Sequence, residues 1–244
     1  MNDRQNDNPD GSANFRGTAL RKRFGLRLLV SSGLLAIALA APSAGLADRA
    51  PAPIGGPLAR VSSAPVSAEA RQVADWVQRS GDNRLMPFMI VDKANARMFV
   101  FAPDGALLGD APVLLGLARG DDSPPGIGDR PLASISPAER ITPAGRFEAS
   151  LGRNLAGQDI LWVDYAAAIS VHRATDVKPG LATANRLARL ASSTAADNRI
   201  SHGCINVSPA VFETMIRPAF SGTRGVVYVL PETRSVHAEF PAAA

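Results

Sequence analysis

Short apolar runs separated by turn-forming residues recur from Phe88 onward, and this pattern constrains the fold of the 244-residue chain more than any other feature. The first two runs, Phe88–Val91 and Met98–Phe101, flank the polar segment Asp92–Arg97 and predict a β-hairpin. Further strands are predicted at Ala111–Leu117, Arg146–Leu151, Ile160–Tyr165, Ala168–His172 and Val226–Leu230. Because most elements are strands and the helices are few, we expect an α+β or mainly β domain and not a doubly wound sheet.

Helices are predicted at both ends of this strand-rich region. Ser67 is a candidate N-cap for a helix that ends near Gly81, and three apolar residues recur on one face of it: Val73, Trp76 and Val77. Ser208-Pro209 starts another helix, which Pro218 is expected to stop. Between the strands, Gly120–Arg140 is dense in Pro, Gly, Asp and Ser, and its length predicts a functional loop.

The first 47 residues are predicted to be an export signal peptide. Arg21-Lys22-Arg23 precedes an apolar stretch from Leu28 to Ala41, and small residues near Ala47 suit a signal peptidase. The stretch is shorter than the roughly 20 residues that a membrane span needs. We therefore expect export to the periplasm or cell envelope, with membrane anchoring only if the leader stays uncleaved.

The rest of the chain divides by composition into four parts. Residues 48–65 are a Pro/Ala-rich linker, 66–86 hold the N-terminal helix, 87–231 form the main domain and 232–244 are a polar tail. The net charge is +4, but six basic and three acidic residues lie in the predicted signal peptide. The remainder is almost neutral, so it lacks the basic surface typical of nucleic-acid binding, and we expect no nucleic-acid partner.

Candidate chemistry is concentrated around Cys204, the only cysteine of the chain. A single cysteine forms no internal disulfide, and a free thiol in an oxidising compartment is either buried and inert or used in chemistry. Two of the three histidines, His172 and His202, are candidate partners that would take its proton, whereas His237 lies in the polar tail. Gly203 beside the thiol would let an acyl group approach the backbone.

Two segments resemble the L,D-transpeptidases of the YkuD type. The signature of that family is a histidine, a gap and then Ser/Thr-His-Gly-Cys-hydrophobic-Asn, and the matching residues here are His172 and Ser201-His202-Gly203-Cys204-Ile205-Asn206. Thr142-Pro143-Ala144-Gly145-Arg146-Phe147 is similar to the family's Thr-Pro-x-Gly-x-Phe segment, and the hairpin that holds Val91-Asp92-Lys93 is similar to its opening hairpin. The resemblance covers about Pro87 to Pro231 and implies a YkuD-like β-sandwich catalytic domain with a few short helices.

The resemblance also implies roles for single residues. Cys204 would be the nucleophile that forms a thioester, and His172 would be the general base and later the acid. His202 would shape the oxyanion site and ranks second as base, while the backbone N–H groups of Gly203 and Cys204 would face the oxyanion. Ser201 and Asn206 fall at substrate-binding positions of the motif, although short polar residues at a strand–turn junction are also commonly structural.

The gap between His172 and Ser201 is longer than is usual for the family and holds a predicted surface helix, Leu181–Ala191. Its arginines, Arg186 and Arg189, are expected to line a substrate groove opposite the Gly120–Arg140 loop, because guanidinium groups pair with carboxylates. A solvated helix is the alternative. Arg173 directly follows the candidate base and would meet a substrate carboxylate or form an exposed salt bridge.

The implied reaction is acyl transfer on peptidoglycan stem peptides, from the residue before a terminal D-alanine to an amine, in cell wall assembly or remodelling. It needs no cofactor and no metal. The alternatives are an L,D-carboxypeptidase, which gives the same thioester to water, a zinc site built from the two histidines and the thiol, and a non-catalytic peptidoglycan-binding protein. A thiol–disulfide oxidoreductase of the C-x-x-C type is excluded by the single cysteine.

Overall fold

The computed structural model describes residues 66–175 and 185–243. The predicted signal peptide (1–47), the predicted linker (48–65) and the first residues of the predicted surface helix, 181–184, lie outside the described residues. No helix among the described residues is long and apolar enough to cross a membrane.

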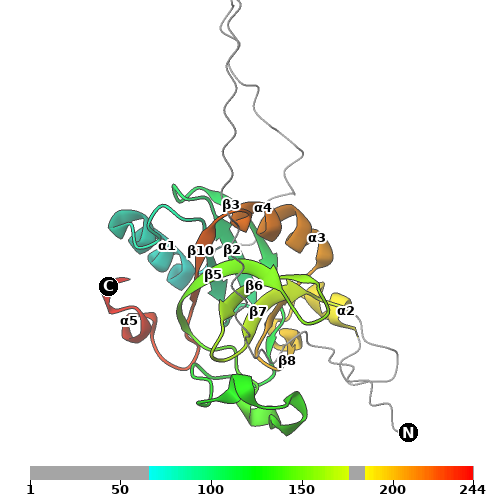
Figure 1. Ribbon diagram of the computed structural model, residues 1–244. Helices are drawn as coiled ribbons and strands as arrows, with labels where there is room; N and C mark the ends of the chain where they lie inside the picture. The colour runs from blue at the N-terminus through cyan, green and yellow to red at the C-terminus, as the bar shows by residue number, and fades with distance from the viewer. Residues whose placement is uncertain (1–65, 176–184, 244) are drawn as a thin grey trace, which may run out of the picture. The chain divides into compact units, whose positions relative to one another are not determined.

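Eight strands form one mixed sheet in the order β3-β2-β1-β10-β5-β6-β7-β9 (Figure 1). Two neighbouring pairs, β1 with β10 and β7 with β9, are parallel, and the other pairs are antiparallel. The strands of the sheet are β1 (Phe88–Asp92), β2 (Arg97–Phe101), β3 (Leu107–Pro112), β5 (Gly145–Arg153), β6 (Asp159–Asp164), β7 (Ile169–Arg173), β9 (Ile205–Val207) and β10 (Arg224–Val229). A separate parallel pair joins β4 (Leu115–Gly116) to β8 (Arg199–Ser201).

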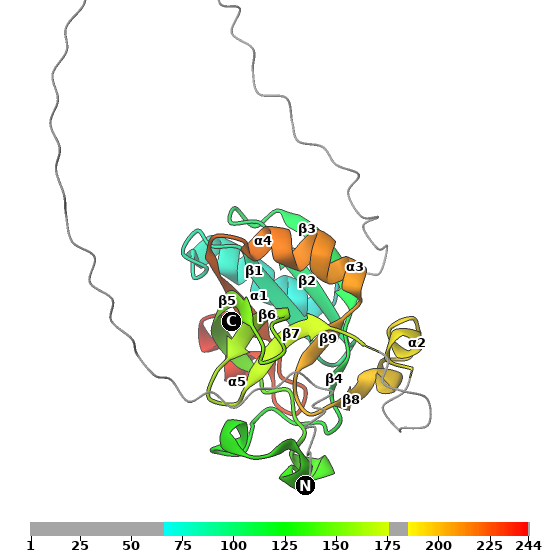
Figure 2. The ribbon, with the colours of Figure 1, turned by 45° about the vertical axis from the view of Figure 1, so that its right-hand side comes forward.

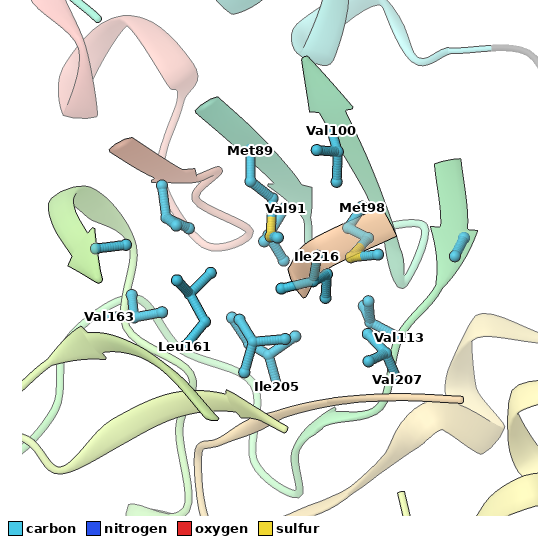
Figure 3. Close-up of a cluster of buried hydrophobic side chains, with 14 of the residues drawn as sticks. Met89, Val91, Met98, Val100, Val113, Leu161, Val163, Ile205, Val207 and Ile216 are labelled. Carbon is cyan, nitrogen blue, oxygen red and sulfur yellow. The ribbon is translucent and has the colours of Figure 1, made fainter. Parts of the chain in front are cut away.

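The main hydrophobic core lies on one face of this sheet, which curls around it. Side chains alternate between faces along a strand, so every second residue of the apolar runs enters this core. Figure 3 shows Met89 and Val91 of β1 directed toward Leu161 of β6 and Ile205, the first residue of β9. Ile216 packs into the same cluster from the helical segment that follows β9.

A second core covers the opposite face of β1, β2 and β10. Helix α1 (Ala68–Ser80) begins at Ser67, whose hydroxyl accepts from the Ala70 N–H, and ends at Gly81 in the left-handed region, as predicted. Its buried residues pack against Phe88 and Ile90, which explains why β1 is a continuous apolar run: both of its faces are covered. The C-terminal residues join this core through α5 (Val236–Glu239) and η6 (Pro241–Ala243), so residues 236–243 are packed and are not only part of a polar tail.

The predicted mainly β, α+β class with a few short helices is confirmed. The single strand predicted over Ala111–Leu117 is wrong: β3 ends at Pro112 and β4 pairs elsewhere, with β8. The second helix also departs from its prediction, because it continues through Pro218 as α3 (Pro209–Val211), a π-helical turn (Phe212–Ile216) and α4 (Arg217–Phe220). Pro218 lies in the first turn of α4. The N–H groups of a first turn have no partner within their own α-helical segment, so a proline is tolerated there.

Candidate active site

The parallel pairing of β7 with β9 brings the candidate residues together. His172 lies directly opposite Asn206 in the register, and Val171 lies opposite Ile205. Val171 and Ile205 enter the main core, so His172 and Asn206 share the other face of the sheet. The paired strands β7 and β9 therefore bring the candidate base, His172, next to Asn206 at the end of the cysteine motif, although the two residues are 34 positions apart in the chain. Figure 2 shows β7 and β9 side by side, with α2 and β8 close to them.

Cys204 immediately precedes β9 and is 97 % buried, with 3 % of its surface exposed. Its Sγ lies 3.8 Å from the hydroxyl oxygen of Ser170 and 3.6 Å from the carbonyl oxygen of Ala168, to which the thiol donates. Ser170 is a residue that the sequence analysis missed. The available signal was its position two residues before His172 on a predicted strand, which places both side chains on one face.

The ring of His172 is held at both nitrogens. Nδ1 lies 3.1 Å from the carbonyl oxygen of Arg173, and Nε2 lies 2.9 Å from the amide nitrogen of Asn206. Asn206 is fully buried, and its Oδ1 accepts a 2.8 Å hydrogen bond from Nη1 of Arg186. Asn206 thus orients protein groups in this structure, and the expectation that it contacts a substrate stays a prediction.

The side chain of Ser201 closes the turn that runs from Ser201 to Cys204. The buried Ser201 hydroxyl donates to the Cys204 carbonyl over 2.6 Å and accepts from the Gly203 N–H over 3.0 Å. In this conformation the Gly203 N–H is engaged inside the turn and the Ser201 hydroxyl is satisfied by the backbone. An oxyanion role for Gly203 and a substrate-binding role for Ser201 stay predictions. Gly203 has a φ of +129°, and a Cβ there would lie 2.7 Å from the Ile141 carbonyl oxygen, so both conformation and space require glycine.

The Thr-Pro segment supports the same turn from the other side. Thr142 is buried, and its hydroxyl donates to the Gly203 carbonyl over 2.7 Å while accepting from the Gly116 N–H over 2.8 Å. Its own carbonyl accepts a 2.9 Å hydrogen bond from Nζ of Lys93. A continuous chain of hydrogen bonds therefore runs from the β1–β2 hairpin to the residue next to the thiol.

Lys93 is itself part of a buried charge cluster. Its Nζ lies 2.8 Å from the Asp121 carboxylate and 3.9 Å from that of Glu232, which also binds Arg199. Burial lowers the pKa of Lys93, against the opposing effect of Asp121. Burial alone would raise the pKa of Asp121, but hydrogen bonds from Lys93, Thr233 and backbone N–H groups hold it well below its ordinary 3.8.

The three arginines proposed for substrate binding have protein partners. Arg173 pairs with Glu213, bonds the Asp159 carbonyl and lies over the Phe212 ring at 4.0 Å, which matches the salt-bridge alternative. Arg186 is fully buried on α2 (Arg186–Leu190), so the expectation that it faces a groove is wrong. Arg189 is partly exposed and donates to the Asp197 carbonyl over 2.7 Å.

The Gly120–Arg140 loop packs against the turn that holds Ala168, and its predicted role as one wall of the site stays a prediction. It contains three short 3₁₀ turns: η1 (Ile127–Asp129), η2 (Leu132–Ser134) and η3 (Pro137–Glu139). A Cβ at Gly128 would lie 2.4 Å from the Ala166 carbonyl, so η1 packs directly on the β6–β7 turn. That turn ends at Ala168, whose carbonyl accepts from Cys204.

His202 lies in the turn between β8 and β9 and is partly exposed, whereas His172 is buried. Exposed His237 lies on α5, in the packed C-terminal segment. Within residues 66–175 and 185–243, no group of three or more His, Cys, Asp or Glu side chains is arranged to hold a metal ion.

No protein-family model matches the chain, and no curated protein sequence matches it. Several solved structures are similar at low identity. A mutant of the helical cell shape determining protein Pgp2 from Campylobacter jejuni is 14 % identical, with a TM-score of 0.42 over 73 % of this chain and 62 % of that chain. An L,D-transpeptidase mutant from Enterococcus faecium is 19 % identical, with a TM-score of 0.33 over 59 % of this chain and 50 % of that chain.

A third similar structure is the L,D-transpeptidase from Xylanimonas cellulosilytica. It is 17 % identical, with a TM-score of 0.33 over 59 % of this chain and 60 % of that chain. The chain thus spans between 50 % and 62 % of the length of these three solved structures.

Proposed function

We propose that this protein is a cysteine-dependent L,D-transpeptidase that acts on peptidoglycan stem peptides in the cell envelope. The observation that supports it is the β7–β9 pairing, which gathers Ser170, His172, Cys204 and Asn206 on one side of the sheet. A purely binding protein has no need to gather a lone thiol and a buried imidazole held at both nitrogens on one face of the sheet. The motif resemblance supplies the substrate class.

The reaction has two halves. In the first, Cys204 Sγ attacks the carbonyl carbon that precedes the terminal D-alanine, and the thiol proton passes through His172 to the departing amine. The products are a thioester on Cys204 and free D-alanine. In the second half, an amine nitrogen of the acceptor attacks the thioester carbonyl, and the proton that it loses returns through His172 to the sulfur.

The closed turn limits which groups stabilise the oxyanion. Since the Gly203 N–H donates to Ser201, it becomes available to the oxyanion only if the turn opens around the bound substrate. Catalytic hydrogen bonds commonly tighten on substrate binding, so this rearrangement is compatible with the mechanism.

The decisive experiment is intact-mass measurement of the protein after exposure to a stem tetrapeptide. We expect one adduct whose mass equals the tetrapeptide minus alanine, absent in Cys204→Ala and retained in His237→Ala. Adding an amine acceptor should then yield a cross-linked peptide, whereas release of tripeptide alone identifies an L,D-carboxypeptidase. An alkylatable Cys204 that never forms the adduct contradicts both activities and favours a binding protein.

A further inference from the structure

A buried arginine from the long insertion reaches the candidate base through one intermediate residue. Arg186 and Leu190 lie four residues apart, so they share one face of α2. Leu190 anchors that face in a small cluster with Leu114, Ala174 and Ile200. The insertion therefore presents a guanidinium group inward at one end of α2 and an apolar side chain at the other.

The contacts form a line of three hydrogen bonds. Arg186 Nη1 lies 2.8 Å from Asn206 Oδ1, Asn206 Nδ2 lies 2.9 Å from His172 Nε2, and His172 Nδ1 lies 3.1 Å from the Arg173 carbonyl oxygen. Arg186 and Asn206 are fully buried and His172 is 8 % exposed, so water has little access to these bonds. Hydrogen bonds in such surroundings are stronger than in water.

The chemistry of arginine decides the direction of every bond in this line. A guanidinium group has donors only, so the atom of Asn206 that faces it must be the amide oxygen. The amide NH₂ then points at His172 and donates to Nε2, which must carry a lone pair and no proton. The neutral ring consequently holds its proton on Nδ1, which donates to the Arg173 carbonyl.

We propose that Arg186 is a positioning residue that, through Asn206, keeps Nε2 of His172 unprotonated and so fixes the tautomer and the orientation of the candidate base. This inference rests on the proposed function only for its catalytic consequence. A proton on Nε2 would face the Asn206 NH₂ as a second donor, while Arg186 holds the amide against rotation. The arrangement therefore keeps the proton off Nε2 in the resting protein.

The direct test is the tautomer of His172 in the resting, full-length protein. Long-range ¹H–¹⁵N NMR distinguishes the two ring nitrogens, and loss of signals in His202→Ala and His237→Ala assigns the third ring. We expect a single tautomer with the proton on Nδ1 in the native protein. Arg186→Met should give a mixture, Arg186→Lys should restore the single tautomer, and Arg189→Met, the matched control on the same helix, should leave it unchanged.

A native-like tautomer in folded Arg186→Met overturns the proposal. If that variant does not fold, Asn206→Asp provides the second test, since its carboxylate still accepts from Arg186 but presents an acceptor to His172. We expect Nε2 to become protonated in this variant, and an unprotonated Nε2 there also overturns the proposal. Neither measurement needs a substrate, so a protein without transpeptidase activity leaves this test intact.

Kinetics separate positioning from substrate binding. Because general acid–base catalysis contributes on the order of 10²–10⁴-fold, we expect Arg186→Met to lower kcat by about 10-fold or more with little change in KM. Arg186→Lys should recover most of kcat. A raised KM with unchanged kcat would instead mean that Arg186 binds the donor carboxylate, against the buried geometry.

Discussion

Thr142 donates its hydroxyl proton to the Gly203 carbonyl over 2.7 Å, joining residues 61 positions apart in the chain. The same hydroxyl accepts from the Gly116 N–H. One side chain therefore fixes β4 and the turn that carries Cys204, and neither partner is exposed to water that would replace it.

Replacing Thr142 by valine should destabilise the protein and loosen the turn. The two side chains have nearly the same shape, but valine leaves one buried acceptor and one buried donor unsatisfied, which costs about 2–5 kcal/mol of unfolding free energy. Urea denaturation measures this loss. Thr142→Ser keeps both hydrogen bonds and should lose much less. A native-like stability of Thr142→Val would contradict the importance of the hydroxyl.

Gly203→Ala should disrupt the turn more than an alanine at Gly222, a remote glycine that also has a positive φ. Gly203 has a φ of +129° and would place Cβ 2.7 Å from the Ile141 carbonyl, whereas Gly222 has a φ of +71° and open space around it. Backbone strain at a left-handed φ costs about 1–3 kcal/mol, so the excess at Gly203 reports its less accessible φ together with the steric clash. We expect Cys204 alkylation rates to change in Gly203→Ala and to stay native in Gly222→Ala. Native rates in both variants contradict this interpretation of the turn.

Lys93→Met should be strongly destabilising although it removes a charge from the interior. The Lys93 and Asp121 side chains are 0 % and 1 % exposed, and methionine leaves the Asp121 carboxylate buried without its cation. Breaking a buried pair in this way costs about 3–5 kcal/mol. The loss is read from thermal or urea unfolding, with Arg153→Met at an exposed salt bridge as the control. A loss as small as the control's would mean that water replaces Lys93.

The same pair predicts acid sensitivity. The folded pKa of Asp121 lies below its ordinary 3.8, so its stabilising contribution is fully present above that value and is lost as the pH falls through the range below it. Asp121→Asn removes this titration. The unfolding free-energy difference between the native protein and Asp121→Asn should therefore be large at about pH 6 and shrink at about pH 3. A difference that does not change with pH contradicts a depressed pKa.

Ser170→Ala should alter the reactivity of Cys204 without a large change in stability. The Ser170 hydroxyl lies 3.8 Å from Sγ, and either atom is able to donate, so the hydroxyl favours the thiolate when it donates to sulfur. We expect alkylation of Cys204 by a small neutral reagent to slow several-fold near neutral pH, by analogy with the loss of one hydrogen bond of about 1 kcal/mol. Ser150→Ala, on β5 in the same sheet, is the comparison variant. Unchanged rates in both would remove Ser170 from the site.

Local pattern in the sequence was sufficient for much of the fold. The hairpin of β1 and β2, helix α1 with its Ser67 cap and Gly81 end, and strands β5, β6, β7 and β10 follow from apolar period and turn residues within a short window. The break between β3 and β4 did not, because it depends on pairing of Leu115 and Gly116 with a strand more than 80 residues later.

The site divides in the same way. Its residue types, a lone Cys204 with His172 and a glycine beside the thiol, were recognisable from the sequence alone. Helical spacing, however, shows which residues share a face of a helix but not which face is buried. It could not show that Arg186 points inward while Leu187 is exposed. The partner that draws Arg186 inward is Asn206, on a strand placed by the β7–β9 pairing.

The sequence by itself therefore determined most of the elements and the residue types of the candidate site, whereas the tertiary structure decided what each polar group bonds to. Ser201, Asn206 and Arg186 all carry polar groups that suit a substrate, and all are engaged by protein partners. The physical reason is that a buried donor or acceptor must be satisfied, and its partner is set by packing between distant segments. Periodicity and spacing record only the near neighbours along the chain.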